Sequence, residues 1–352
     1  MTLDIVKSYL SEITIATPRQ LVEAVGVCGS LIDCWSIDGI SGRQFRRFLP
    51  KEVRKKSYIE FDVPKKTGGV RHISAPVEEL KKIQQALNLM LQALADFSPC
   101  ATGFITGKSV VDNAKIHLGQ SVVFNCDLKN FFPSITKEMV RKALRSQLWD
   151  KMSSREVINM ICSIATVPDE NGVERLPQGA PTSPVLSNIV LAELDRRLEG
   201  FASANGYRYS RYADDISFSH SHSEQTMRPE KIATIFSIIE EYGLTVNEKK
   251  TKVSTRAERQ EVTGLTVGDK VNVSRRYVKE LRVLLHLWEK RGFDEAQQIF
   301  TRDFCNGIET ALNTAVNGKI NYLAMVKGRE DSTYKKLKWR YRRLMRQLKK
   351  FI

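Results

Sequence analysis

Two adjacent aspartates, Asp214 and Asp215, follow a segment whose residues alternate like a strand, and a second alternating segment follows them. The pattern predicts that both acids lie at the tip of a tight hairpin. That tip lacks the glycine or asparagine that a two-residue turn favours. Neighbouring carboxylates repel each other, whereas Mg²⁺ binds carboxylate oxygens together with substrate phosphates. The pair therefore indicates a hard-cation site, with a solvated acidic turn as the alternative.

A third acid, Asp127, ends the apolar segment 121–126, which predicts a buried strand. An acid at a buried strand end qualifies as a further metal ligand. Two metal ions about 4 Å apart can activate a 3′-hydroxyl and stabilise a leaving pyrophosphate, and phosphoryl transfer needs little beyond positioning and charge. Because 87 positions separate Asp127 from Asp214, spacing does not show that the two meet.

Composition favours a folded protein with a polyanionic partner. Of 352 residues, 42% are hydrophobic, and 55 Lys and Arg against 40 Asp and Glu give a net charge of +15. No apolar run reaches the roughly 18 residues of a membrane-spanning helix, and no secretory signal opens the sequence. The six cysteines are scattered without a CxxC pair, which favours a reduced, cytoplasmic protein. Nucleic acid is thus preferred to a membrane as the partner.

The surrounding elements predict an α+β fold with an all-helical C-terminal part. Short helices are expected over 1–56, a hairpin with a basic tip over 58–73, and an amphipathic helix from Leu80 to Leu94. A strand pair is expected over 207–219 and a further hairpin over 261–273. Helices are expected over 137–165, 184–199 and 229–242 and from about 275 onward.

Five motifs in order resemble the palm of reverse transcriptases over about 60–270. They are Asp127…Phe132, Gln178-Gly179-Ala180-Pro181-Thr182-Ser183-Pro184, Tyr212-Ala213-Asp214-Asp215, Gly243-Leu244…Lys250-Thr251-Lys252 and Val262-Thr263-Gly264-Leu265. The resemblance implies a right-hand polymerase fold with an antiparallel palm sheet flanked by helices. The expected parts are an N-terminal helical extension (1–56), fingers (57–120 and 137–180), palm (121–136 and 181–273) and a basic helical thumb (274–352).

The same resemblance implies an RNA-directed DNA polymerase that uses two Mg²⁺ ions and dNTPs. Asp127 and Asp214 would be the principal metal ligands, Asp215 would support them, and the backbone carbonyl of Leu128 would complete a metal shell. Lys250 resembles the lysine near the leaving pyrophosphate, a general acid, with Lys249 and Lys252 as rivals.

Five residues resemble the nucleotide-binding residues of the family. Phe132 resembles the steric gate that fills the space of a ribose 2′-hydroxyl; a core phenylalanine is the alternative. Gln178 and Gly179 resemble the loop that packs on the incoming nucleotide and template. Lys65 and Arg71 resemble the fingers residues that bind the triphosphate, and a solvated charged turn is their alternative.

Two smaller motifs, Asn113-Ala114-Lys115-Ile116-His117 and Val262-Thr263-Gly264, resemble those of bacterial retron reverse transcriptases, with His117 expected to be architectural. The resemblance implies a cognate structured non-coding RNA, priming from a guanosine 2′-hydroxyl and multicopy single-stranded DNA as the product. It also implies an antiphage role with an accessory effector. No further domain is expected after the thumb. The alternatives are a group II intron-like or other stand-alone reverse transcriptase, and a catalytically inactive RNA-binding palm.

The basic C-terminal helix is the expected site of RNA recognition, because its cations can follow phosphates while an aromatic ring stacks on a base. A solubilising basic tail is the alternative. Val262, Thr263 and Gly264 are expected to bind RNA as well. The residues expected on the helix are Lys335, Lys336, Lys338, Trp339, Arg340, Tyr341, Arg342, Arg343, Arg346, Lys349 and Lys350.

Overall fold

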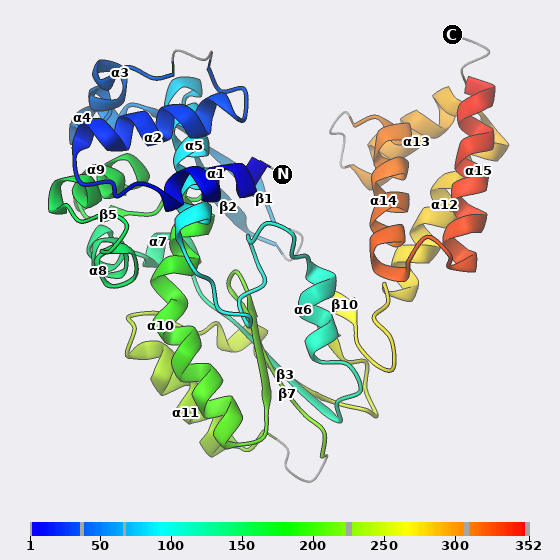
Figure 1. Cartoon of the computed structure of the whole chain (residues 1–352). Helices are drawn as coiled ribbons and strands as arrows, with labels where there is room; N and C mark the ends of the chain where they lie inside the picture. The colour runs from blue at the N-terminus through cyan, green and yellow to red at the C-terminus, as the bar shows by residue number, and fades with distance from the viewer. Residues whose placement is uncertain (1, 36–38, 66–67, 223–226, 306–309, 349–352) are drawn as a thin grey trace. The chain divides into compact units, whose positions relative to one another are not determined.

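The computed structural model describes residues 2–35, 39–65, 68–222, 227–305 and 310–348 (Figure 1). Within these limits the chain divides into two compact units. The first comprises Met1–Ser109, Phe124–Phe218 and Met227–Lys252, and the second comprises Val110–Val123, Ser219–Thr226 and Val253–Ile352. Helices and strands occur in each unit, which confirms the α+β prediction.

Short helices open the first unit, as predicted for residues 1–56. Thr17 and Gln20 cap each other at the start of α2, and Pro18 stands in the first turn, where a missing N–H is tolerated. Ser41 and Gln44 form the same capping box at α3. The helices are α1 (Thr2–Ser11), α2 (Pro18–Ser30), α3 (Gly42–Arg47) and α4 (Lys51–Lys55).

A hairpin of two seven-residue strands follows, β1 (Tyr58–Pro64) and β2 (Val70–Pro76). The strands are antiparallel, with Tyr58 opposite Pro76 and Pro64 opposite Val70. Lys66 and Thr67 of the predicted basic tip lie outside the described residues. The base of the hairpin is tied to a distant loop, because the Ser74 N–H donates to the Gln178 carbonyl at 2.8 Å.

Helix α5 (Glu78–Leu94) supplies much of the first unit's core. All five leucines and isoleucines of its predicted apolar stripe are buried, and burying each side chain stabilises the fold by about 1.5–3 kcal/mol. The helix expected over 137–165 is two helices, because Ser154 starts a new one by accepting a hydrogen bond from the Val157 N–H. These are α8 (Lys137–Leu148) and α9 (Arg155–Ala165).

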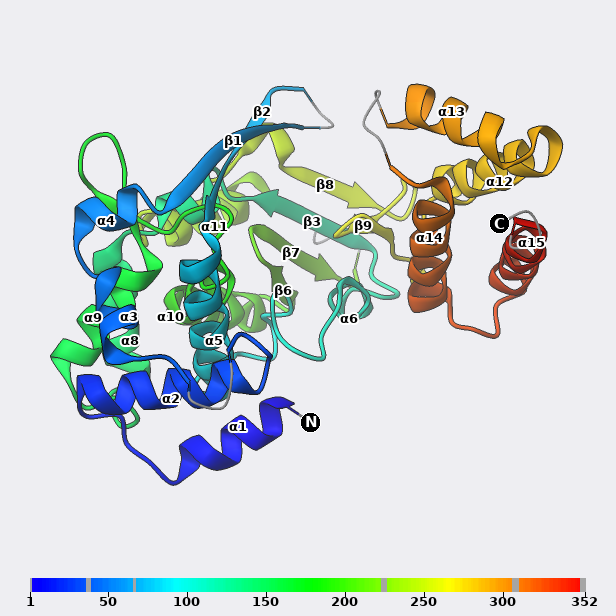
Figure 2. The ribbon, with the colours of Figure 1, turned by 90° about the horizontal axis from the view of Figure 1, so that it is seen from above.

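The central sheet has four strands in the order β6-β7-β3-β8, which Figure 2 shows side by side. Helix α10 (Ser183–Ala204) packs against β6, α8 and α11. This arrangement puts β3, far earlier in the chain, beside the predicted hairpin of β6 and β7. The elements are β3 (Val122–Asp127), α7 (Phe131–Ser134), β4 (Val167–Pro168), β5 (Glu174–Arg175), β6 (Arg208–Tyr212), β7 (Asp215–His220), α11 (Pro229–Glu240), η1 (Glu248–Lys250) and β8 (Lys252–Thr255).

The second unit joins a helical bundle to a small hairpin through one apolar core. Residues of α6, of the hairpin β9–β10 and of four C-terminal helices share that core. On the last helix Leu337 and Leu344 are buried in this core. The elements are α6 (Val110–Ile116), β9 (Glu261–Val262), β10 (Leu265–Thr266), α12 (Arg275–Arg291), α13 (Phe293–Phe304), α14 (Leu312–Lys327) and α15 (Ser332–Leu348).

Candidate active site

The turn between β6 and β7 has a strained backbone. Ala213 has a φ of 58°, in the left-handed region that costs a residue with a Cβ roughly 1–2 kcal/mol. Asp214 follows it, and Asp215 begins β7. The turn that lacks glycine in the sequence therefore places an alanine in the left-handed region. Such an alanine must be held in this conformation by its surroundings.

The end of β3 lies against this turn. The Leu128 N–H donates to the Asp214 carbonyl at 3.1 Å, and the Asp127 carbonyl accepts the Asn247 N–H at 2.7 Å. Two acids 87 positions apart in the sequence thus belong to one hydrogen-bonded junction. The structure brings together Asp127, Leu128, Asp214 and Asp215.

The three carboxylates repel one another electrostatically. Burial, followed by the charges of Asp214 and Asp127, raises the pKa of Asp215 to about 7. Burial and the charge of Asp127 also raise the pKa of Asp214, although Lys250 and Arg71 oppose the rise. A site where negative charge is crowded and partly desolvated favours a cation.

One cation already lies at the cluster. The Lys250 Nζ donates to Asp127 Oδ2 at 2.8 Å, and this hydrogen bond raises the pKa of Lys250. Among the three lysines that the sequence left open, Lys250 is therefore the one in contact with a carboxylate of the site. Lys250 is the last residue of the short helix η1.

The donor set fits magnesium in its chemistry, because it consists of carboxylates and backbone carbonyls. Within the described residues, however, no group of three or more His, Cys, Asp or Glu side chains could hold a metal ion as the side chains stand. Asp127 Oδ2 lies 2.8 Å from the ammonium of Lys250.

The predicted nucleotide loop packs against the hairpin of β1 and β2. Gly179 has a φ of 136°, and a Cβ there would lie 2.8 Å from the Ser74 carbonyl oxygen. Only glycine permits this approach. Arg71, on β2, is close enough for its charge to lower the pKa of Asp214, whereas Lys65 is exposed at the turn.

Phe132 belongs to a row of aromatic rings beside the acidic turn. Its ring centroid lies 5.1 Å from that of Phe131 and 6.0 Å from that of Phe104, whose centroid is 6.4 Å from that of Tyr212. Phe132 is only partly buried, so its ring is not enclosed in the core. Phe104 was not predicted, because it precedes Phe132 by 28 positions and belongs to none of the motifs.

The basic residues of α15 divide between two environments. Arg340 donates to both carboxylate oxygens of Glu289 at 3.0 and 2.6 Å, and Arg343 donates to the same carboxylate. Trp339 is 60% exposed, with the Arg343 guanidinium 4.9 Å from the centre of its ring. A groove of about 440 Å³ is lined by Tyr334, Lys335, Lys338, Trp339, Arg342, Arg343 and Arg346. Lys336 is exposed, and Lys349 and Lys350 lie outside the described residues.

The two smaller motifs meet in the second unit. Helix α6, which carries Asn113 and Ala114, packs against β9 and β10, and the Thr263 hydroxyl donates to the Val110 carbonyl at 3.4 Å. Val262 is buried, while Thr263 and Gly264 form the left-handed turn between the two strands. His117 is buried, with Nδ1 2.7 Å from the Ser219 hydroxyl, which fits the architectural role expected for it.

Comparison with known proteins identifies the family. A profile described as reverse transcriptase (RNA-dependent DNA polymerase) matches residues 63–273. The chain is 38% identical over 281 residues to the retron Mx65 reverse transcriptase of Myxococcus xanthus, covering 77% of this chain and 62% of that one. It is 33% identical over 233 residues to the retron Ec83 reverse transcriptase of Escherichia coli, covering 64% of this chain and 74% of that one. A solved telomerase from Candida albicans, in complex with a TWJ fragment of telomeric RNA, has a TM-score of 0.45 at 15% identity, covering 84% of this chain and 64% of that chain.

The chain therefore belongs to the reverse transcriptase family, and within it to the bacterial retron reverse transcriptases, as its motifs predicted. It spans less than two thirds of the length of the Mx65 enzyme. In the described part of the chain, no helix is both long enough and apolar enough to cross a membrane. All six cysteines are free thiols.

Proposed function

We propose that the chain is an RNA-directed DNA polymerase whose active site contains Asp127, Asp214 and Asp215. The hydrogen bond from the Leu128 N–H to the Asp214 carbonyl supports this proposal most strongly, because it joins the end of β3 to the acidic turn. Asp127 and Asp214 would be the principal metal ligands, with Asp215 and the Leu128 carbonyl in support. Two Mg²⁺ ions, when bound there, supply activation of the attacking hydroxyl and neutralise charge on the leaving pyrophosphate.

The remaining site residues would bind and orient the nucleotide. Arg71 and Lys65 would bind the triphosphate, and the Gln178–Gly179 loop would pack on the nucleotide and template. The Phe132 ring would occupy the space that a ribose 2′-hydroxyl needs. Lys250 holds a proton at Nζ and would transfer it to the leaving pyrophosphate, so that the charge developing there is neutralised.

The test is DNA synthesis by the purified full chain on an RNA template with a primer, dNTPs and Mg²⁺. We expect Asp214→Asn to abolish synthesis, because it removes a charge that binds the ions. Asp303→Asn is the matched control, since Asp303 is exposed and forms an ion pair with the adjacent Arg302. Synthesis that persists in Asp214→Asn would refute the metal assignment. Failure of the unmodified protein to incorporate any dNTP would favour an RNA-binding palm without activity.

We further propose that the template is a cognate structured non-coding RNA, copied in part into multicopy single-stranded DNA from a guanosine 2′-hydroxyl. The packing of α6 on the Val262–Gly264 segment supports a retron-type arrangement. Such a cytoplasmic enzyme would act in antiphage defence with an accessory effector. Nucleic acid that copurifies with the protein should contain one RNA joined to DNA through a 2′–5′ bond, which a debranching enzyme cleaves. Priming from 3′-hydroxyls on unrelated RNA would favour a group II intron-like enzyme instead.

A further inference from the structure

We propose that Arg211 is a positioning residue that sets the backbone of the Ala213–Asp214 turn, and that Asp195 and Asn188 hold it in place. The proposal rests on the function proposed above, in which Asp214 holds a metal ion. Arg211 lies on β6, two residues before the left-handed Ala213. No sequence motif discussed above includes Asp195 or Asn188, both of which lie on α10.

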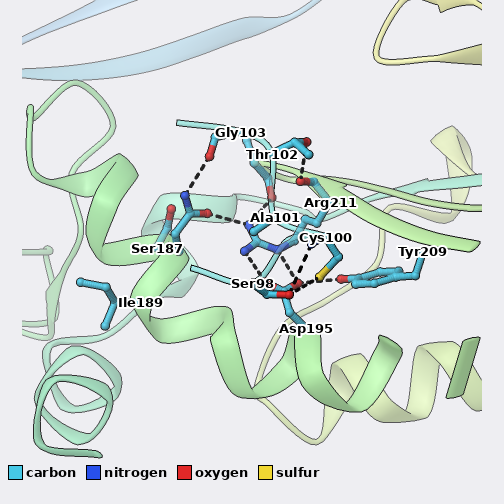
Figure 3. A network of polar contacts seen from close by, with 12 residues as sticks. Ser98, Cys100, Ala101, Thr102, Gly103, Ser187, Ile189, Asp195, Tyr209 and Arg211 are labelled. Atoms are coloured by element: carbon cyan, nitrogen blue, oxygen red, sulfur yellow. Dashed lines mark hydrogen bonds and ion pairs between the residues drawn. The ribbon is translucent and has the colours of Figure 1, made fainter. Parts of the chain in front are cut away.

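The guanidinium of Arg211 is buried and fixed by two parallel hydrogen bonds. Its Nε and Nη2 atoms donate to Asp195 Oδ1 and Oδ2 at 2.8 and 2.6 Å (Figure 3). The side chains of Arg211 and Asp195 are 0% and 1% exposed. Tyr209 also donates its hydroxyl hydrogen to Asp195 Oδ1, at 2.7 Å. A bidentate pair of this kind fixes the plane of the guanidinium as well as its position.

The remaining terminal nitrogen of Arg211 reaches the turn. Nη1 donates to the Ala213 carbonyl at 3.1 Å and to Asn188 Oδ1 at 3.1 Å. The Ala213 carbonyl belongs to the peptide that joins Ala213 to Asp214. The donor therefore fixes the orientation of the peptide bond immediately before the metal-binding aspartate.

Gly103, in the loop that precedes α6, packs against the turn and is itself held by Asn188. Asn188 donates from Nδ2 to the Gly103 carbonyl at 2.8 Å. A Cβ on Gly103 would lie 2.5 Å from the Ala213 nitrogen, too close for any other residue. The Thr102 N–H and hydroxyl both donate to the Arg211 carbonyl, at 2.9 and 3.1 Å. Asn188 thus links the two groups that contact Ala213.

The energetics favour a role in geometry. A buried ion pair adds little net stability compared with apolar residues of the same size, because both charges lose their hydration. The turn, in contrast, needs external restraint, since Ala213 is strained and the carboxylates beside it repel one another. A rigid, fully bonded donor aimed at the Ala213 carbonyl supplies that restraint.

Arg54 offers a matched control. It is also buried, pairs with Glu174 and donates to the Thr166 carbonyl at 3.1 Å. Its partners Thr166, Leu49 and Glu174 all lie outside the turn. Arg211→Lys and Arg54→Lys therefore each replace a planar guanidinium in a buried ion pair by an ammonium. Of the two arginines, Arg211 is the one that contacts Ala213. Asn188→Ala is a second test variant that leaves the Arg211–Asp195 pair in place.

The experiment compares these variants by steady-state kinetics, melting temperature and amide hydrogen exchange. In Arg211→Lys we expect kcat to fall by about tenfold to a hundredfold with little change in KM for dNTP, because the carboxylate is displaced by a fraction of an ångström. The Leu128 amide, which donates to the Asp214 carbonyl, should exchange faster without any added metal. Asn188→Ala should show the same pattern more weakly. Arg54→Lys should lower the melting temperature while leaving kcat and the exchange at Leu128 unchanged.

Two outcomes would overturn the inference. One is that Arg211→Lys and Arg54→Lys lose kcat equally. The other is that exchange at Leu128 is unchanged in both Arg211→Lys and Asn188→Ala. If Arg211→Lys does not fold, Asn188→Ala decides by the same criteria. DNA synthesis by Asp214→Asn would instead refute the proposed function itself. Failure of the Arg211 inference and failure of the proposed function are therefore distinguishable.

Discussion

Lys250 donates a hydrogen bond from Nζ to Asp127 Oδ2 at 2.8 Å, across 123 positions of the sequence. The lysine side chain is 55% exposed and the aspartate side chain 12%. The ammonium therefore lies at the more exposed side of the carboxylate cluster. Its pKa is raised by the hydrogen bond to Asp127, so Lys250 is protonated at neutral pH and able to donate.

Lys250→Ala should lower the rate of nucleotide incorporation by about a hundredfold or more, the usual contribution of a general acid. Lys249→Ala and Lys252→Ala are the controls, since Lys250 is the lysine of the three that forms an ion pair with Asp127 in the described part of the chain. Single-turnover incorporation of one dNTP measures the chemical step. An equal loss of incorporation rate in Lys249→Ala would contradict the assignment of Lys250 as the general acid.

Phe132→Ala should weaken discrimination against ribonucleotides by about tenfold or more, because a shape-based filter is lost. The quantity to measure is the ratio of kcat/KM for a dNTP to that for the matching rNTP. Phe104→Ala removes the next ring in the row and should leave the ratio nearly unchanged. If Phe132→Ala keeps its selectivity, another residue is the gate.

Gly179→Ala should raise KM for dNTP severalfold, because its new Cβ would push the loop away from Ser74. The positive φ adds roughly 1–3 kcal/mol of backbone strain. Gly200→Ala is the control: Gly200 is in α10, and a Cβ there meets nothing within 4 Å. That change should stabilise the protein by about 0.5–1 kcal/mol. Equal KM values in the two variants would contradict the close approach.

Arg342→Ala should weaken RNA binding and reduce the slope of log affinity against log salt by about one, the change expected for one lost phosphate contact. Arg342 lines the groove on α15. Arg302→Ala, an exposed arginine on α13 paired with Asp303, should leave the slope unchanged. Filter binding at several salt concentrations provides the measurement. A slope unaffected by Arg342→Ala would favour a solubilising role for this helix.

Glu289 should make the stability of the second unit pH-dependent. Hydrogen bonding by Arg340, with further help from its charge and that of Arg343, lowers the pKa of Glu289 below its usual 4.5. A lowered folded-state pKa stabilises the protein above pH 4.5 and loses that effect as pH falls through the folded value. The melting temperatures of Glu289→Gln and the unmodified chain should therefore differ at neutral pH and converge as the pH falls below 4.5. The matched control is Glu295→Gln, which removes the carboxylate of an exposed pair.

Local sequence patterns predicted most of the helices and strands, whereas non-local contacts determine which residues meet in the site. Apolar spacing located α5, and alternating residues located the β6–β7 hairpin. The meeting of Asp127 with Asp214 depends on β3 lying beside β7 in the sheet, which spacing does not encode. The choice of Lys250 over Lys249 depends on the short helix η1.

The role of Arg211 was missed for a similar reason. An arginine in an alternating strand suggests a solvent-facing side chain, and its partner Asp195 lies on a helix that carries no polar motif at that position. The available signal was that Arg211 has the same parity as Tyr207 and Tyr209, which places all three on one face. That face is buried.

The hydrogen bond between Ser74 and Gln178 also bears on engineering. It fastens the hairpin at its base, whereas Pro64 and Val70 face each other at the opposite end of the two strands. Substitutions at that end should therefore alter the nucleotide binding proposed above and leave the acidic residues in place. Variant libraries that target nucleotide binding can be confined to the few codons around Pro64 and Val70.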